Sequence, residues 1–427
     1  MSGTDFSLCL LRTNHRLKSV PRFTTSMAGD KDNLDITTQL VHAGERSGPP
    51  SGQPTSTPIY ASSTYTYESM EEIDQVFAGD KQGYIYTRYG NPTVSAFEEA
   101  MRTAEAGATA CAYSSGMAAL HAALFACELS PGATVLASQD LYGATTNLLQ
   151  TIFGSFGIKT VTVDFNDLDT LRAKTNELKP RALVAETISN PLLKVFDIDA
   201  CAEIAHAIGG RLIVDNTFAS PYLCRPLEHG ADIVVHSATK FLSGHADAMG
   251  GVAVSREQTD SLALIGVMKL VGGVLSPWEA HEILRGLKTL GVRMDRHCEN
   301  AAALAEHLRK HPRVGRVYFP GFIAAEHREV VERILGPNQS GSMVSIELKE
   351  NSQAAAFRFM NALKLCVRAT SLGDVFTGVL HPATASHREL SPVRRLQLGI
   401  TDGLVRISVG IENIKDIIAD IDQALEK

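Results

Sequence analysis

The sequence predicts an α/β protein with a large domain on a mostly parallel sheet and a smaller C-terminal α+β domain. Its 427 residues exceed the usual size of a single core, so two domains are expected. From Thr93 onward, short apolar runs alternate with helical patterns, which is typical of βα units. Towards the C-terminus the pattern changes to separate strands and helices, which favours an α+β domain there.

The large domain is expected to begin with a helix over 93–105, a strand over 110–113 and a helix that starts near Ser115. Several later apolar runs end in polar residues, so they suit a parallel sheet that is buried on both faces. Ligands of such sheets bind at the carboxyl ends of the strands. The expected further strands are 134–137, 159–163, 182–186, 211–215, 233–237 and 252–255.

A long amphipathic pattern covers 283–308, and we place the domain boundary within it. The chain then divides into an N-terminal tail and arm, a large domain and a small domain, with bounds 1–92, 93–291 and 292–427. In the small domain the patterns predict strands at 344–348 and 404–409, and helices at 355–365 and after the cap residue Asn413.

The composition excludes several classes of function. Hydrophobic residues make up 44% of the chain and charged residues 20%, as in an ordinary globular protein. The net charge of -7 leaves no broad basic surface for nucleic acid. No apolar run is long enough to span a bilayer, so no membrane partner is expected. Chemistry on a small molecule is favoured.

The seven cysteines are scattered and form no C-x-x-C pair, which indicates neither a disulfide framework nor a zinc site. The histidines are equally dispersed, so we expect no metal. Together these features favour a reducing, cytoplasmic location. Residues 1–26 are basic and rich in Ser and Thr, which fits a disordered tail, a transit peptide, or a start codon placed before Met27. The tail interpretations are favoured over import.

The strongest chemical signal lies between Asp215 and Gly251. Asp215 ends one expected strand, and Ser237, Thr239 and Lys240 follow the end of the next, so these groups should converge at one sheet edge. A pyridoxal phosphate (PLP) site needs such groups: a lysine for the Schiff base, a carboxylate for the ring nitrogen and hydroxyls for the phosphate. A surface lysine beside a strand-end aspartate is the plain alternative, but the combination favours the site.

Other segments are weaker when each is taken alone. Gly116 and Met117 open a helix, whose first N–H groups could hold a phosphate or form an ordinary helix cap. Tyr142 follows a strand and could cover a flat cofactor or be a half-buried core residue. Asn190 precedes a proline and could bind a ring hydroxyl or belong to a turn.

The segment before the large domain also carries a candidate. Tyr86 and Arg88 occupy alternating positions, and from an extended chain both could grip a phosphate. An Arg–Tyr surface stack is the alternative. Because this arm leaves the core, the phosphate it reaches could belong to a neighbouring subunit.

Eight motifs, in this order, resemble the Cys/Met-metabolism family of PLP-dependent enzymes, and the match runs from about Asn33 to the C-terminus. The family includes cystathionine γ-synthase, cystathionine β- and γ-lyases, methionine γ-lyase and O-acetylhomoserine sulfhydrylase. The motifs are YTRYGNPT, YSSGMAAL, DLYG, ETISNPLLKVFDI, IVDNTFASP, HSATKFLSGH, SLGDVFTGVLHPATASH and VRISVGIE.

The resemblance implies the fold-type I architecture and a role for each candidate residue. Lys240 would attach PLP and move protons, Asp215 would face the ring nitrogen, and Tyr142 would stack on the ring and act as an acid/base. It further implies a homotetramer of catalytic dimers. The remaining assignments are Asn190 for the ring hydroxyl; Gly116, Met117, Ser237 and Thr239 for the phosphate, with Tyr86 and Arg88 from the other subunit; and Arg406 with the loop at Ser371 for the substrate carboxylate.

The segment after Ser371 indicates which substrate side chain the enzyme prefers. Cystathionine-handling relatives usually supply a Glu there, whereas Phe376 occupies the corresponding position. An apolar ring disfavours an ammonium group, so an uncharged substrate side chain is favoured. Ala144 occupies the position where methionine γ-lyases typically have Cys, and this argues against a methionine γ-lyase. We expect γ-elimination from a sulfur amino acid, with γ-replacement on an O-acylhomoserine as the alternative.

A remote alternative from another class is a serine acyl-enzyme. The segment 237–240 also fits S-x-x-K, but the supporting S-D-N and K-T-G elements are absent from the sequence.

Overall fold

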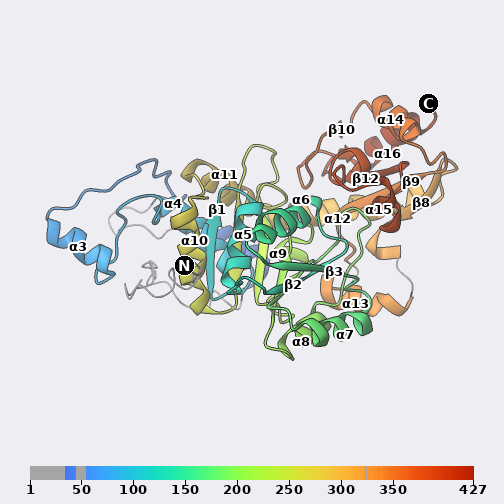
Figure 1. Ribbon diagram of the computed structural model, residues 1–427. Helices are drawn as coiled ribbons and strands as arrows, with labels where there is room; N and C mark the ends of the chain where they lie inside the picture. Colours follow the sequence, from blue (N-terminus) through green and yellow to red (C-terminus); the bar gives the residue numbers. More distant parts are fainter. Residues whose placement is uncertain (1–33, 45–53, 323–324, 338) are drawn as a thin grey trace.

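The computed structural model describes residues 34–44, 54–322, 325–337 and 339–427. Two sheets organise the chain (Figure 1): a seven-stranded sheet with the order β1-β7-β6-β5-β4-β2-β3 and a five-stranded sheet with the order β10-β11-β12-β9-β8. The predicted α/β class, with a smaller C-terminal sheet, is confirmed. Residues 1–26, for which a tail or transit peptide was considered, lie outside the described residues.

The large sheet consists of the strands expected from the sequence, each within one or two residues. β7 is antiparallel to both of its neighbours, β1 and β6, whereas the other pairs are parallel. The run at 252–255 is therefore an exception to the parallel arrangement. The strands are β1 (Thr109–Tyr113), β2 (Thr134–Ser138), β3 (Lys159–Val163), β4 (Ala182–Glu186), β5 (Arg211–Asp215), β6 (Ile233–Ser237) and β7 (Gly251–Ser255).

Both faces of this sheet are buried, which explains why the middle positions of its central strands are apolar on both faces. Ile213 and Val235 belong to the core on the face that carries α5 (Gly116–Ala126) and α10 (Ser261–Val271). Leu212 and Val234 belong to the core on the opposite face. That face carries α4 (Pro92–Ala104), α8 (Ile198–His206) and α11 (Pro277–Leu287).

The C-terminal sheet packs its own core against two helices, α14 (Gln353–Ala362) and α16 (Ile414–Leu425). Asn413 caps α16 by accepting a hydrogen bond from the Lys415 backbone N–H, as the sequence predicted. The strands are β8 (Val314–Tyr318), β9 (Met343–Leu348), β10 (Val367–Arg368), β11 (Gly378–Leu380) and β12 (Leu404–Ser408). β8, β10 and β11 were not expected from the sequence.

The amphipathic pattern over 283–308 forms two helices, α11 and α12 (Leu290–Arg309). α12 serves both cores, because Leu290 and Met294 pack with the large sheet while Leu304 and Leu308 pack with the small one. The proposed boundary between residues 291 and 292 falls at the start of this shared helix.

The segment before the large sheet projects away from it as an arm that carries α3 (Met70–Ala78) (Figure 1). An isolated bridge joins Thr64 and Tyr86 in this arm. The chain at Tyr86 turns instead of continuing extended, because the Tyr89 N–H donates to the Tyr86 carbonyl at 2.7 Å. The expectation of an extended chain at this point was wrong.

The remaining helices connect these elements. They are α2 (Ile36–His42), α6 (Gly143–Asn147), a π-helical turn η2 (Leu148–Phe153), α7 (Leu168–Leu178), α9 (Ser220–Leu223), α13 (Ala325–Leu335), α15 (Pro392–Gln397) and the short turns η3 (Gln258–Asp260), η4 (Pro320–Phe322) and η5 (Pro382–Thr384). Within the described ranges, no helix is both long and apolar enough to cross a membrane.

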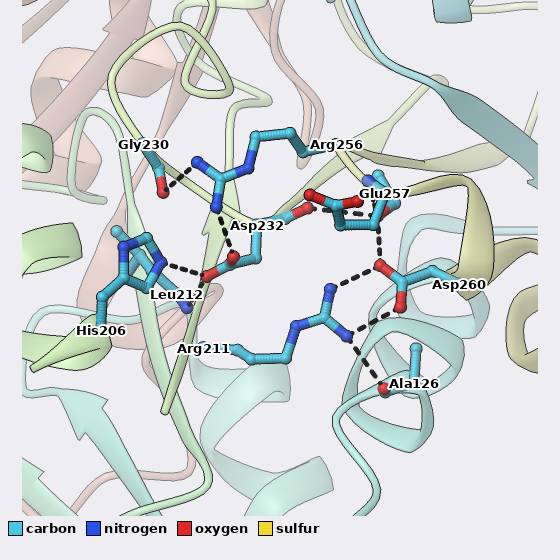
Figure 2. Close-up of polar contacts among 10 residues, drawn as sticks. Ala126, His206, Arg211, Leu212, Gly230, Asp232, Arg256, Glu257 and Asp260 are labelled. Carbon is cyan, nitrogen blue, oxygen red and sulfur yellow. Dashed lines mark hydrogen bonds and ion pairs between the residues drawn. The ribbon is translucent and has the colours of Figure 1, made fainter. Parts of the chain in front are cut away.

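Charged side chains join the strands at the amino-terminal end of β5 and beside β6 (Figure 2). Asp232 accepts hydrogen bonds from the Leu212 N–H at 2.7 Å and the Arg256 guanidinium at 2.9 Å, and it contacts His206. Arg211 pairs with Asp260, which also accepts a bond from Ser255. These contacts hold the edge of the sheet opposite the carboxyl ends of β4, β5 and β6.

Candidate active site

The carboxyl ends of three neighbouring strands bring the predicted polar groups together. Glu186 ends β4, Asp215 ends β5 and Ser237 ends β6, and these strands are parallel neighbours. Lys240 follows three residues after the end of β6. The convergence expected from the strand ends is therefore what the sheet topology produces.

Lys240 contacts the loop at Ser371, which the sequence predicted to hold the substrate carboxylate. Its Nζ donates a hydrogen bond to the Ser371 hydroxyl at 3.2 Å. Burial and the positive charge of Arg406 lower the pKa of the Lys240 ammonium, while the Asp374 carboxylate opposes this shift. A lowered pKa increases the fraction of neutral amine, which is the form that attacks a carbonyl carbon.

Asp215 is tied to β6 through Thr217. The Thr217 N–H donates to Asp215 Oδ1 at 2.9 Å, and the Thr217 hydroxyl accepts the Ser237 N–H at 2.8 Å. Loss of hydration raises the pKa of Asp215, and the bonds from Thr217 oppose that change. A carboxylate in such surroundings favours a positively charged partner, such as a protonated ring nitrogen.

The first turn of α5 lies directly against the end of β6. A Cβ atom on Gly116 would approach the Ser237 Cα to 2.8 Å, so only glycine permits this contact. Ser115 caps the helix by accepting the Ala118 N–H at 3.2 Å. The helix N-terminus, with Met117 in its first turn, thus lies beside Ser237 at the end of β6, an arrangement that suits a phosphate. The Thr239 hydroxyl is hydrogen-bonded to the Gly250 backbone.

Tyr142 and Asn190 come from separate loops, and Glu186 connects them. The Tyr142 backbone N–H donates to Glu186 Oε1 at 2.5 Å, and the Asn190 N–H donates to Glu186 Oε2 at 3.2 Å. The Tyr142 side chain is 40% exposed, so its ring is open to a ligand.

Arg406 reaches the site from β12 of the small sheet. Its guanidinium donates to Asn190 Oδ1 at 2.9 Å and to the Ser371 carbonyl at 3.2 Å. Among the described residues its buried Nε has no hydrogen-bond partner. Burial lowers the pKa of Arg406 to about 10. A buried guanidinium with a free donor suits a carboxylate ligand.

Tyr86 and Arg88 lie apart from this group. Arg88 donates to the Lys269 carbonyl in α10 at 2.5 Å, and its guanidinium lies 5.6 Å from the Tyr86 ring centroid. In the part of the chain that the structure describes, no hydrogen bond or ion pair joins either residue to Ser237 or Lys240. The two residues do form the Arg–Tyr stack that the sequence left open.

Phe376 is half-buried in the loop that follows Ser371. The neighbouring Thr377 N–H donates to Glu412 Oε1 at 2.6 Å, which anchors the loop to the segment after β12. Asp374 belongs to the same loop, and its negative charge opposes the lowering of the Lys240 pKa.

Sequence reasoning assigned no role at the site to three residues: Glu186, Thr217 and Asp374. Glu186 had a detectable signal, because it ends a strand in the same way as Asp215. Thr217 and Asp374 lie in loops, and only the folded chain shows what they contact. No group of metal-ligating side chains occurs among the described residues.

A family model described as "Cys/Met metabolism PLP-dependent enzyme" matches residues 37–426. The chain belongs to this family. L-methionine γ-lyase of Fusobacterium nucleatum subsp. nucleatum is 43% identical over 374 residues, which are 87% of this chain and 93% of that protein. O-succinylhomoserine sulfhydrylase of Pseudomonas aeruginosa is 38% identical over 400 residues, which are 93% of this chain and 96% of that protein.

The fold of this chain is similar to that of a solved structure, a "putative O-acetylhomoserine (thiol)-lyase" from Campylobacter jejuni subsp. jejuni. Its TM-score is 0.87 at 30% identity, and the match covers 92% of this chain and 100% of that one. That structure contains N'-pyridoxyl-lysine-5'-monophosphate. The chain is a PLP-dependent enzyme of sulfur amino-acid metabolism, and the fold-type I expectation is confirmed.

The residues of this structure fit PLP. The lowered pKa of Lys240 suits attachment to an aldehyde, and Asp215 suits the ring nitrogen. The close approach of Gly116 to Ser237 puts the α5 N-terminus beside the end of β6, an arrangement that suits a phosphate. The free Nε of Arg406 suits the substrate carboxylate.

Proposed function

We propose that this enzyme catalyses γ-elimination from methionine or a cystathionine-type substrate, giving a 2-oxo acid, ammonia and a thiol. The observation that carries the proposal is the similarity to L-methionine γ-lyases, six of which are between 38% and 43% identical to this chain. For methionine, one water is consumed and 2-oxobutanoate, ammonia and methanethiol are released.

PLP, when bound, supplies the electron sink for this reaction. Lys240 Nζ would hold the cofactor and would move protons at the substrate Cα and Cβ. Asp215 keeps the ring nitrogen protonated, and Asn190 orients the ring hydroxyl. Tyr142 covers the ring and donates a proton to the leaving sulfur.

Substrate orientation falls to the small domain and the loop beside it. Arg406 holds the α-carboxylate by a bidentate contact, and Ser371 supports both Arg406 and Lys240. Phe376 disfavours a distal ammonium group. Gly116, Met117, Ser237 and Thr239 hold the phosphate.

We further propose a cytoplasmic homotetramer of catalytic dimers, in which Tyr86 and Arg88 of one subunit bind the phosphate in the other. Both residues lie between α3 and α4, in the segment that precedes the large sheet, and among the described residues Arg88 contacts α10 and not Lys240 of its own chain, which supports this arrangement. The domain division at 92/93 and 291/292 is part of the same proposal.

The second candidate is γ-replacement on an O-acylhomoserine. The 38% identity to O-succinylhomoserine sulfhydrylase favours it, because elimination and replacement use the same residues. The outcome depends on which molecule enters the pocket after the γ-substituent leaves. Membership of a PLP-dependent family leaves the serine acyl-enzyme hypothesis without support.

The test incubates PLP-reconstituted enzyme separately with methionine, cystathionine and O-acetylhomoserine, without added thiol, and measures 2-oxobutanoate. Rapid release from methionine is expected. Release from cystathionine alone would overturn the role of Phe376. Product that appears only after sulfide or cysteine is added, together with a new thioether, would replace the elimination proposal with γ-replacement. Phe376→Leu serves as the apolar control for Phe376→Glu, which should shift preference towards cystathionine.

A further inference from the structure

Glu186 lies at the carboxyl end of β4, where it is the register partner of Asp215 on β5. Register partners on neighbouring strands project to the same face of a sheet. Glu186 is only 9% exposed, and nothing in the proposed reaction uses its acid chemistry. A buried carboxyl beside a second carboxyl is costly, so its presence needs a structural reason.

Both carboxyl oxygens of Glu186 are occupied by backbone donors from different loops. The Tyr142 N–H approaches Oε1 to 2.5 Å in the loop after β2, and the Asn190 N–H approaches Oε2 to 3.2 Å in the loop after β4. The Glu186 side chain therefore sets the separation between Tyr142 and Asn190. These are the residues proposed to cover the cofactor ring and to bind its hydroxyl.

The connection continues from Asn190 into the substrate half of the site. Asn190 Oδ1 accepts Arg406 Nη1, and Arg406 Nη2 donates to the Ser371 carbonyl. The Ser371 hydroxyl accepts Lys240 Nζ. Hydrogen bonds and the short chain segments between them thus connect Tyr142 to Lys240. Glu186 joins the two residues proposed to contact the cofactor ring, and Asn190 continues the connection to Arg406.

We propose that Glu186 is a positioning residue that couples the Tyr142 ring to the Asn190–Arg406 carboxylate site. The proposal rests on the proposed roles of those residues. It concerns geometry: Glu186 touches neither substrate nor cofactor, and it acts through two backbone segments.

Glu186→Gln tests this directly, because the amide nitrogen would face a backbone N–H donor in place of an acceptor. One loop should then lose its anchor. We expect the visible circular dichroism band of bound PLP, per mole of cofactor, to change in size or sign as the ring tilts. PLP should dissociate roughly 10- to 100-fold more readily, as is typical when a buried donor loses its partner. The affinity for L-norleucine, which has no γ leaving group, should also fall.

Asp420→Asn is the matched control. Asp420 is also buried and accepts three backbone N–H bonds, at 2.8 Å each, from Lys364, Leu365 and Cys366. It lies on α16 in the small-sheet core, away from the site. The same chemical change there should lower the melting temperature and leave the visible dichroism per bound cofactor and the L-norleucine affinity unchanged.

If Glu186→Gln does not fold, Glu186→Asp decides the matter, because it keeps the carboxyl group and is one methylene too short to reach both N–H groups. A changed dichroism band in Glu186→Asp supports positioning by geometry. Unchanged dichroism and unchanged L-norleucine affinity in the folded variant overturn the proposal. If the wild-type enzyme takes up PLP but does not act on methionine, only the proposed reaction is contradicted. The dichroism and the L-norleucine affinity do not require turnover, so they still test the role of Glu186.

Discussion

The chemistry of individual residues in this site is set by their neighbours as much as by their type. Lys240 is an ordinary amine until burial and Arg406 lower its pKa, and Asp215 becomes a suitable partner for a cation because it has lost hydration. Ser371 contacts both Lys240 and Arg406, so one small residue aligns the amine and the guanidinium. The motif residues therefore work as one hydrogen-bonded group.

Lys240→Ala should abolish turnover, by roughly 1,000-fold or more, since the variant loses both the cofactor attachment and the proton carrier. Its fold should persist because Lys240 contributes no core packing. Measurement of 2-oxobutanoate, with far-ultraviolet circular dichroism as the check on folding, tests this. Substantial turnover in a folded variant would remove Lys240 from its assigned role.

The stability of the PLP-free protein should depend on pH through Glu186. Burial, together with the charges of Asp215 and Asp140, raises the pKa of Glu186 well above its ordinary value, while the Tyr142 and Asn190 N–H groups oppose the rise. The folded state therefore binds a proton that the unfolded state releases, so the free energy of unfolding should fall as pH rises from the ordinary carboxyl pKa through the raised one.

Urea unfolding at several pH values measures this dependence. Glu186→Gln, which cannot ionise, should remove that part of the slope while the contributions of other groups remain. An identical slope in the two proteins would show that Glu186 keeps an ordinary pKa.

At the scale of elements, the site depends on how closely α5 approaches β6. Gly116 lies in the first turn of α5, where a Cβ would come within 2.8 Å of both Cα and Cβ of Ser237. Any side chain at this position must push the helix N-terminus away from the strand end. The phosphate contacts proposed for Ser237 and for the helix N–H groups would then no longer converge.

Gly116→Ala should therefore weaken PLP binding by about 10-fold or more, on the scale of one lost charge-assisted hydrogen bond. Gly266→Ala is the control, because Gly266 lies within α10 and a Cβ there meets nothing within 4 Å. Alanine at that helical position should keep the affinity and stabilise the protein by up to about 1 kcal/mol. Equilibrium dialysis of PLP compares the two, and equal affinities would contradict the close-approach argument.

At the scale of the whole molecule, the two sheets meet through α12 and through Arg406, which brings the small sheet to the end of the large one. The arm that carries α3 extends in another direction (Figure 1), and Tyr86 and Arg88 follow it in the chain. These two stacked residues do not contact Lys240 of the same chain among the described residues, which is consistent with a role in a neighbouring subunit.

Hybrid assemblies test that role. Arg88→Ala and Lys240→Ala should each be inactive or nearly so. If Arg88 completes the partner's site, subunits mixed by unfolding and refolding should regain up to roughly a quarter of wild-type activity, because a hybrid dimer contains one intact site. Mixing without refolding is the control. No recovery from properly reassembled hybrids would place Arg88 in the site of its own chain or outside both.

The sequence predicted the strands of the large sheet well because their apolar runs are buried on both faces and end sharply in polar residues. Lys240, Asp215 and Ser237 were found for the same reason, since parallel strands place their carboxyl ends together. β8, β10 and β11 were missed because they are short or partly exposed and carry no such pattern. The turn at Tyr86–Gly90 was missed because alternation alone does not distinguish a turn from an extended chain.

The sequence by itself determined the α/β class, the family and the residue types that the chemistry requires, because strand periodicity and strand-end residues are local properties of the chain. Only the tertiary structure decided that Glu186 joins Tyr142 to Asn190, that Arg406 arrives from the second sheet, and that Asp374 acts on Lys240. These contacts join segments far apart in the chain, so they arise only when sheet order and helix packing bring buried hydrogen-bonding groups to their partners.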